Sequence, residues 1–278
     1  MNGHNACIVV EDLWFQYTEE IVALRGINLE IPDGAFVAVL GQNGSGKTTL
    51  VKHFNGLLKP TRGRVTVYGQ DTATLPVGRL ARTVGYVFQN PDHQIFCPTT
   101  REEIEFGPRN LDLPPEEVER RTEEALEYFG LTKHADDPPA LLGFGLRRKI
   151  TIAAVYAMRP QIFILDEPTT GLDWRSSMDM LRLVQDLHRA GHTILLITHD
   201  MKIAAEFSEL CLVLRDGEVL LFDDTRSVFR QSDVLRQSQI EPPQILLLAK
   251  RMASLGMPDD VLTVREFCDA YVALRRSR

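Results

Sequence analysis

Residues 41–48 read Gly-Gln-Asn-Gly-Ser-Gly-Lys-Thr, a short run that combines glycines with one lysine and one threonine hydroxyl. Glycines let successive backbone N–H groups converge on phosphate oxygens, and a helix that starts at the end of the run adds partial positive charge. The Lys47 ammonium can neutralise β- and γ-phosphate charge, and the Thr48 hydroxyl can bind magnesium. The alternative is a glycine-rich turn with an incidental lysine, but the apolar run before it and the helical pattern after it favour phosphate binding. The predicted nucleotide-binding positions in and beside this loop are Gly41, Gln42, Asn43, Gly44, Ser45, Gly46, Lys47, Thr48 and Thr49.

Two adjacent acids provide the second chemical feature. Asp166 and Glu167 follow the apolar run 162–165, which is predicted to be a buried strand. Such a strand delivers Asp166 to its carboxyl end, where the carboxylate can hold magnesium through water. Glu167 is then placed to polarise a water molecule that attacks a phosphate. A purely structural pair of acids at a strand end is the alternative, and the complete phosphate loop upstream argues against it.

The elements that must position these groups alternate between strands and helices. Apolar runs typical of strands buried on both faces lie at 35–40, 65–68, 84–88, 162–165 and 194–198. The run Pro-Pro-Glu-Glu at 114–117 is predicted to open a helix that ends at Gly130. The apolar face of that helix consists of Val118, Thr122, Ala125, Leu126 and Phe129. Strand, glycine-rich turn and helix in this order predict an α/β sandwich, with a hairpin turn at Asp216-Gly217.

The composition excludes several other classes of function. The 278 residues carry a net charge of −7, which disfavours nucleic acid as the main partner. The 4 cysteines are scattered without a Cys-x-x-Cys pair, which disfavours a metal site or a disulfide framework. The first residues lack the charged and apolar regions of a signal peptide, and no apolar run is long enough to span a bilayer. Any work at a membrane would therefore require recruitment by partners.

The order of the motifs resembles that of the ABC-type ATPases. The phosphate loop is followed by Gln89, by a glycine-containing segment at 142–146, and by Asp166-Glu167-Pro168, Leu172-Asp173 and Thr198-His199-Asp200. The resemblance extends from about Tyr17 to Asp200, which is most of the chain. It implies the P-loop sandwich fold of that family, with a helical subdomain at about 90–158. It also implies hydrolysis of ATP with the help of Mg²⁺.

The resemblance gives each matching residue a role. Tyr17 is expected to stack on adenine, and Gln89 to reach magnesium and the attacking water while it senses a membrane partner. Glu167 is the expected general base, His199 steadies the γ-phosphate, and Asp173 signals between two sites. Lys47 completes the predicted catalytic set, and Thr48, Gln89 and Asp166 form the predicted metal set. Taken singly, Tyr17, Gln89 and His199 have ordinary structural interpretations as a strand-edge aromatic, a strand cap and a turn residue. Their occurrence together and in the family's order favours the roles that the resemblance implies.

A finer resemblance concerns the energy-coupling-factor importers, which include a cobalt and nickel type called CbiO and a vitamin type. The segments at 89–96, 99–108, 241–251 and 262–267 are similar to that group. The resemblance implies a nucleotide-binding domain at 1–227 and a C-terminal extension at 228–278 that helps to hold two ATPase subunits together. It implies as partners a second ATPase subunit, a membrane-embedded coupling subunit and a substrate-binding membrane subunit. It thus implies a peripheral position on the cytoplasmic face of the cell membrane, with cobalt or nickel as cargo and a vitamin as the alternative. The carboxylates of Glu102, Glu103 and Glu105 would face arginines of a coupling helix, or else form a solvated acidic helix face.

The segment Leu-Gly-Phe-Gly-Leu at 142–146 departs from the Leu-Ser-Gly-Gly-Gln signature of the ABC family. In that family each signature sits at a helix start, here the helix expected from about Arg147, and faces the nucleotide of the partner subunit. Gly143 and Gly145 retain backbone N–H groups for that phosphate, but Gly143 lacks the serine hydroxyl and Leu146 lacks the glutamine amide. In a heterodimer, a full partner signature would complete this chain's site. In a homodimer both sites would carry the defect, and a regulatory subunit with little hydrolysis is a further alternative.

Two competing classes fit less well. A soluble ABC protein of DNA repair or translation usually carries a long coiled-coil insertion or two ATPase domains, and the sequence shows neither. A P-loop kinase or GTPase would not require a glutamate directly after Asp166 or a histidine at 199, and the chain has no Asn-Lys-x-Asp run to read guanine. The prediction is therefore an ATP-hydrolysing subunit of a membrane importer.

Overall fold

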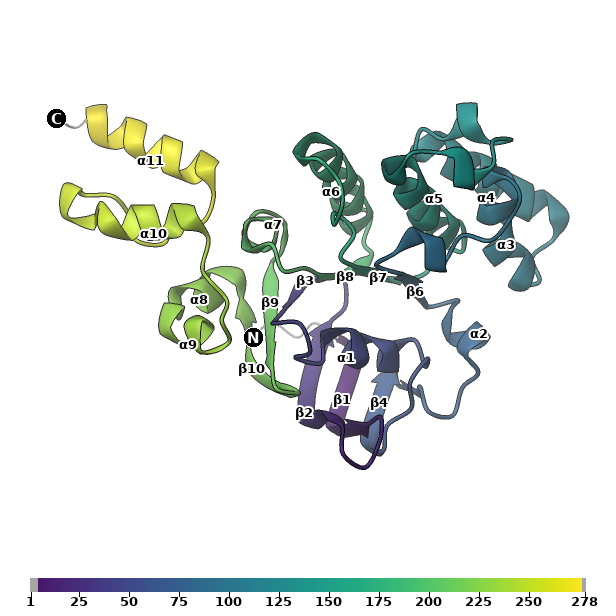
Figure 1. The fold of residues 1–278 in the computed structure, drawn as a ribbon, viewed down its shortest axis with the longest axis horizontal. Coiled ribbons are helices and arrows are strands. Elements are labelled where there is room, and N and C mark those ends of the chain that lie inside the picture. The colour runs from purple at the N-terminus through teal and green to yellow at the C-terminus, as the bar shows by residue number, and fades with distance from the viewer. Residues whose placement is uncertain (1–4, 277–278) are drawn as a thin grey trace.

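In the part of the chain that the structure describes, residues 5–276 of a computed structural model, two β-sheets form the centre of the fold (Figure 1). One sheet is antiparallel and has the order β2 (Val22–Pro32), β1 (Ala6–Gln16), β4 (Arg62–Val67) and β5 (Gln70–Asp71). The other has the order β10 (Glu218–Asp224), β9 (Leu210–Arg215), β3 (Phe36–Leu40), β8 (Thr193–Ile197), β7 (Ile162–Asp166) and β6 (Val84–Val87). Its strands are parallel except for β10 at the edge. The predicted α/β class is confirmed.

The parallel sheet positions the chemical groups. Every residue of β3, β7 and β8 is buried, as the continuous apolar runs predict. The five predicted strands begin and end within one residue of β3, β4, β6, β7 and β8, with one exception. Strand β4 begins three residues earlier than predicted, at Arg62. Parallel strands end at the same edge of a sheet, so the loop after β3, Glu167 after β7 and His199 after β8 are neighbours. The sequence pattern does not predict β1 and β2, because irregular register interrupts their alternation.

Helix α1 (Lys47–Phe54) packs between the two sheets (Figure 1). Its Leu50, Val51 and Phe54 are fully buried in an apolar core shared with β1, β2 and β7. This packing holds the first turn of α1 against the end of β3. It therefore fixes the direction in which the N–H groups at the start of the helix point.

A helical region lies beyond β6 (Figure 1). It contains α3 (Thr100–Asn110), α4 (Pro115–Tyr128) and α5 (Phe144–Ala157), and the short α2 (Val77–Leu80) precedes β6. The predicted apolar face of α4 is confirmed, since Val118, Thr122, Ala125, Leu126 and Phe129 are all buried. A second apolar core, shared with the parallel sheet, contains side chains of α3, α4, α5, α6 (Trp174–Arg189) and α7 (Met201–Phe207).

Helix α5 begins earlier than the sequence predicts. The prediction placed its start at about Arg147, but the helix starts at Phe144, with Gly143 in an extended conformation as its N-cap. Glycine is a poor helix former, which is why the pattern suggests a later start. The consequence is that Phe144, Gly145 and Leu146 form the first helical turn.

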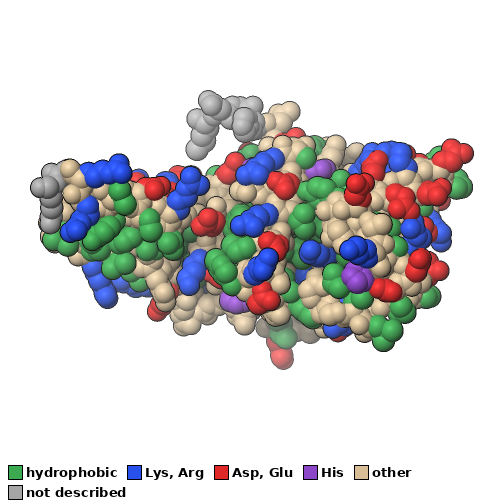
Figure 2. Space-filling model, turned by 90° about the horizontal axis from the view of Figure 1, so that it is seen from above, with side chains coloured by type: hydrophobic (Ala, Val, Ile, Leu, Met, Phe, Trp, Pro, Cys, Tyr) green, Lys and Arg blue, Asp and Glu red, His purple; other side chains and the backbone are tan. Residues whose placement is uncertain are grey.

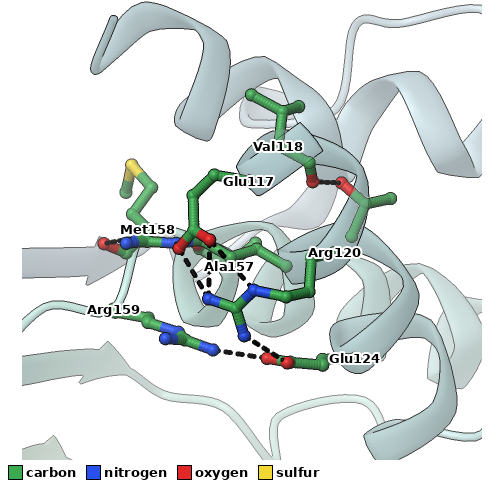
Figure 3. A network of polar contacts seen from close by, with 9 residues as sticks. Glu117, Val118, Arg120, Glu124, Ala157, Met158 and Arg159 are labelled. Carbon is green, nitrogen blue, oxygen red and sulfur yellow. Dashed lines mark hydrogen bonds and ion pairs between the residues drawn. The ribbon is translucent and has the colours of Figure 1, made fainter. Parts of the chain in front are cut away.

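Ion pairs fasten the outer surface of α4 to the end of α5 (Figure 3). Arg120 contacts Glu117 and Glu124, and Arg159 contacts Glu124 from the residues after α5. Arg121 also donates to the backbone carbonyls of Ala157 and Met158, which end that helix. Exposed pairs of this kind contribute about 0–1 kcal/mol each, so they set the orientation of α4 more than its stability.

The interpretation of the acids of α3 as one carboxylate surface is wrong. Glu102 is exposed, but Glu103 and Glu105 are buried, with 3% and 8% of their surface exposed. The Glu103 carboxylate accepts hydrogen bonds from the backbone N–H groups of Phe96 and Cys97, and Glu105 pairs with Arg109. Glu103 is therefore a structural acceptor that fixes the segment after Gln89, and the rings of Phe96 and Phe106 lie exposed beside it.

After β10 the chain forms four described helices: α8 (Thr225–Arg230), α9 (Ser232–Gln237), α10 (Gln244–Arg251) and α11 (Val264–Arg276). Buried side chains from α8 to α10 pack against β3 and β9, whereas α10 and α11 share a small cluster of their own. Hydrophobic side chains gather over these last helices, at the left of Figure 2. On α11, Val264, Tyr271 and Val272 are exposed. The domain boundary near residue 227 stays a prediction.

The hairpin between β9 and β10 confirms the predicted turn. Asp216 and Gly217 both have positive φ angles, 51° and 83°. Two-residue turns of this kind match the twist of the flanking strands. Within residues 5–276, no helix has the length and apolar character needed to cross a membrane.

The buried acceptor role of Glu103 generates a stability prediction. Replacement by alanine would leave two backbone N–H groups without their acceptor, which should lower the free energy of unfolding by about 2–4 kcal/mol. Glu102→Ala, on the exposed face of the same helical turn, is the matched control and should change it by at most about 1 kcal/mol. Urea unfolding of the three proteins measures the difference. Equal stability of the two variants would contradict the structural role.

Candidate functional site

The loop between β3 and α1 has a backbone that only glycine accommodates at two places. Gly41 and Gly46 have φ angles of 148° and 101°. A Cβ atom on Gly41 would lie 2.4 Å from the Leu214 carbonyl, and one on Gly46 would lie 2.9 Å from Leu24. The turn of the β9–β10 hairpin supports the loop from behind, because the Gly217 N–H donates to the Ser45 carbonyl at 3.1 Å. The loop is thus a rigid cradle that opens at the start of α1.

Lys47 is the first residue of α1, and its side chain folds back over the loop. Its ammonium donates to the carbonyls of Gly41 and Gln42, each at 2.8 Å. An ammonium has three donors, so one remains for a phosphate oxygen. Burial lowers the pKa of Lys47, and the nearby carboxylates of Glu167 and Asp166 oppose this shift. The group is therefore a partly desolvated cation whose charge is strongly felt by an anion in the cradle.

Asp166 ends β7 with one oxygen already hydrogen-bonded. Its Oδ2 accepts from the Thr48 hydroxyl at 3.1 Å and from the Tyr86 hydroxyl at 2.8 Å. Burial and the Asp166 charge raise the pKa of Tyr86, so its hydroxyl stays protonated and acts as a donor. These contacts fix the carboxylate beside the Thr48 hydroxyl, which is the oxygen-rich pairing that magnesium prefers.

The donor set fits a magnesium ion that arrives with a nucleotide. Among the described residues no group of three or more His, Cys, Asp or Glu side chains could hold a metal. Thr48, Asp166 and Gln89 line one cavity, and they supply a hydroxyl, a carboxylate and an amide. Magnesium commonly binds to one or two carboxylates, water and substrate phosphates rather than to a full protein cage, and this set matches that habit.

Glu167 is held in an unusual backbone conformation. Its φ angle is 50°, in the left-handed region that non-glycine residues rarely adopt. Its N–H donates to the Ile197 carbonyl at 3.0 Å, and its carboxylate accepts from the Thr170 hydroxyl at 3.1 Å. The ring nitrogen Nδ1 of His199 lies 2.8 Å from a carboxylate oxygen of Glu167. Strained residues persist where surrounding contacts over-determine them, and they concentrate at functional sites.

These groups meet at one cavity of about 390 Å³. Of the predicted nucleotide-site residues, the following line it: Tyr17, Asn43, Gly44, Gly46, Lys47, Thr48, Thr49, Gln89, Asp166 and Glu167. Gly41, Gln42 and Ser45 form the back of the loop, and His199 reaches the cavity through its contact with Glu167. The Tyr17 ring is 54% exposed at the rim, with its hydroxyl 3.1 Å from that of Thr49.

Three other predicted residues lie apart from the cavity and from the groups that border it. Gly143 and Gly145 lie at the start of α5, and Asp173 caps α6 by accepting a hydrogen bond from the Ser176 N–H at 2.8 Å. That hydrogen bond lowers the pKa of Asp173. A helix start attracts anions, and the first turn of α5 lies outside this chain's own cavity. The structure therefore separates the predicted residues into two places.

Sequence reasoning missed Tyr86 and Thr170. Tyr86 lies within the apolar run 84–88, where an aromatic residue is expected to be core. Its role depends on β6 and β7 being neighbours, which a single sequence does not state. Thr170 lies three residues after Glu167 in a turn, and a threonine hydroxyl close behind an acid at a strand end is a usable local signal.

The chain is similar to known proteins over most of its length. The sequence profile of the ABC transporter family matches residues 24–170. A putative ABC transporter ATP-binding protein of Caldanaerobacter subterraneus is 47% identical over 88% of this chain, and the match spans only 43% of that relative. The energy-coupling factor transporter ATP-binding protein EcfA of Methanothermobacter thermautotrophicus is 40% identical, over 93% of this chain and 84% of that protein.

A solved structure agrees with these relatives. CbiO1 of Clostridium perfringens, described as part of the ABC transporter complex CbiONQ, superposes with a TM-score of 0.76. The two sequences are 34% identical, and the match covers 90% of this chain and 98% of CbiO1. The phosphate loop, the paired acids after β7 and these similarities lead to one assignment. The chain belongs to the ABC transporter family of ATPases, in the group of the energy-coupling factor ATP-binding subunits.

Proposed function

We propose that this chain binds and hydrolyses ATP to power an energy-coupling-factor importer for cobalt or nickel, from the cytoplasmic face of the cell membrane. The observation that carries the proposal is the convergence of Lys47, Asp166 and Glu167 on one cavity at the carboxyl edge of the parallel sheet. Transfer of a phosphoryl group to water requires a cation, a carboxylate that can hold a metal ion and a second carboxylate that can orient the water.

Binding of the nucleotide follows from the cradle. The N–H groups at the start of α1 and the Lys47 ammonium neutralise the phosphates, and the Tyr17 ring at the rim offers a face on which adenine stacks. Thr48, Asp166 and Gln89 would hold Mg²⁺. When bound, this ion offsets the negative charge that develops on the transferred phosphoryl group.

Hydrolysis depends on Glu167. Its carboxylate accepts a proton from the attacking water, and the contact with His199 fixes its orientation. Gln89, which lines the same cavity, would orient the same water. His199, beside Glu167, would steady the γ-phosphate.

The partners follow from the separation of the site. The first turn of α5 and Asp173 would serve the nucleotide of a second ATPase subunit, so each cavity is completed by its partner. The exposed apolar side chains of α11 support a role of the extension at 228–278 in holding the two subunits together. A coupling subunit and a substrate-binding subunit in the membrane would receive the motion of this pair near Gln89.

The cargo is the part of the proposal that rests on resemblance to the CbiO type, with a vitamin as the alternative. The test is co-expression with the membrane subunits of such an importer, purification of the complex and measurement of bound solute by elemental analysis and mass spectrometry. Two results together support the proposal: cobalt or nickel bound to the complex, and uptake of that metal into proteoliposomes only when ATP is present on the side of the membrane that carries the ATPase subunits. A bound vitamin would replace it with the vitamin importer.

Removal of the proposed base should separate binding from turnover. Glu167→Gln keeps the size and the hydrogen bonds of the side chain but removes the proton acceptor, so turnover should fall by at least about 100-fold. Affinity for MgATP, measured with a fluorescent nucleotide, should stay within about twofold. Glu218→Gln, at an exposed glutamate at the start of β10, is the control and should keep the full rate. A rate near that of the unaltered protein in Glu167→Gln would remove Glu167 from the base role.

The departures at 143 and 146 favour one second candidate, an ATP-binding regulatory subunit with little hydrolysis. A side chain added at Gly143 would meet no atom within 4 Å, so a serine fits there without strain. Restoring a hydrogen bond to a charged phosphate is worth about 1.5–3 kcal/mol. In a purified homodimer, Gly143→Ser with Leu146→Gln should therefore raise hydrolysis by roughly 10- to 150-fold. An unchanged rate would mean that the departure has no effect on function.

A further inference from the structure

Arg148 is the largest of the fully buried side chains, with 0% of its surface exposed. It lies one turn into α5, just after the segment 142–146. Within residues 5–276 no carboxylate lies within ion-pair distance of it. A buried cation without a paired anion is costly, so its presence needs a reason other than stability.

The guanidinium group of Arg148 donates hydrogen bonds to two backbone carbonyls. One terminal nitrogen donates to the Phe88 carbonyl at 2.8 Å and the other to the Glu167 carbonyl at 3.3 Å. The guanidinium carbon also lies 5.4 Å from the centre of the Phe144 ring, within the range of a cation–π contact. Burial lowers the pKa of Arg148, and the charges of Asp166 and Glu167 oppose this shift. The side chain is therefore a buried fork aimed at the hydrolytic site.

One of these carbonyls belongs to a cavity residue and the other to the neighbour of one. Phe88 immediately precedes Gln89, and Glu167 is the proposed base. Glu167 has the left-handed φ angle of 50°, so its peptide needs contacts on both sides to stay in place. The Ile197 carbonyl holds its N–H, and Arg148 holds its C=O. The Phe144 ring in turn lies against Gly171, where an added Cβ would come within 3.0 Å of it.

We propose that Arg148 is a positioning residue of the hydrolytic site, which fixes the backbones of Glu167 and Phe88 to helix α5. The inference rests on the proposed function. Through this fork, the helix that carries the segment 142–146 and the two residues that face the attacking water move as one body. Arg148 does not line the cavity, so it acts on turnover through Glu167 and Gln89 and leaves nucleotide binding to the loop at 41–48.

The test compares Arg148→Met with Arg121→Met. Arg121 also donates to two backbone carbonyls, at the other end of α5, and is partly buried, but it is remote from the cavity. Arg148→Met should lower kcat by roughly 10- to 100-fold while KM for MgATP stays within about twofold, and Arg148→Lys should recover part of the loss. Arg121→Met should keep kcat within about twofold. An unaltered kcat in Arg148→Met would overturn the proposal.

A double-variant cycle distinguishes positioning from general damage. If Arg148 acts through Glu167 and Gln89, then Arg148→Met should lower the residual single-turnover rate of Glu167→Gln by a smaller factor than it lowers the rate of the unaltered protein, because only the part that passes through Gln89 remains. A further loss as large as in the unaltered background would overturn the proposal. Full turnover in Glu167→Gln alone would instead refute the base role in the proposed function, and it would say nothing against the contacts of Arg148.

Hydrogen exchange gives a readout that does not depend on activity. Arg148→Met should speed the exchange of backbone amides at 88–90 and 167–168 by at least about tenfold, and Arg121→Met should leave them unchanged. Unchanged exchange at these amides in Arg148→Met would overturn the proposal. If the methionine variant fails to fold, Arg148→Lys carries both experiments, with an expected fall in kcat of about fivefold or more at unchanged KM, and a full rate in that variant would overturn it.

Discussion

Parallel pairing of β3, β8 and β7 is the constraint on which the rest of the structure depends. The register sets Val39 opposite Ile197, and Ile197 opposite Asp166, so three chain segments leave the sheet at one level. Because all three strands are completely buried, a slip in register would expose apolar side chains and is strongly disfavoured. The phosphate loop, the two acids and His199 are therefore brought together by the buried sheet, and not by the polar contacts among them.

Electrostatics then sharpens what the sheet assembles. Lys47, Asp166 and Glu167 are each at least nine-tenths buried, so their charges are weakly screened and a phosphate would feel them strongly. Hydrogen bonds to Asp166 from Thr48 and Tyr86 stabilise its charge and leave it oriented. The site is organised so that the substrate and its metal replace solvent as the partners of groups already held in position.

Much of this could be predicted from the sequence where the signal is local. The phosphate loop, the acids after an apolar run and the Asp216-Gly217 turn are short patterns whose structure follows from neighbouring residues. Tyr86 and Arg148 could not be assigned, because their roles arise from contacts between elements that are distant in sequence. Glu103 was misjudged for the same reason, since an acid on a helix looks solvated until the segment that covers it is known.

The hairpin that supports the phosphate loop has a consequence for engineering. Tips of hairpins are commonly the places where a tag, a fluorophore or a second domain is inserted without harm. Here the Gly217 N–H binds Ser45, its carbonyl accepts from the Arg25 N–H at 2.8 Å, and an added Cβ would lie 2.6 Å from the Ala23 carbonyl. The tip of this hairpin contacts both the antiparallel sheet and the phosphate loop, so an insertion there would disturb the nucleotide site. Inserted sequences should be placed at some other exposed turn.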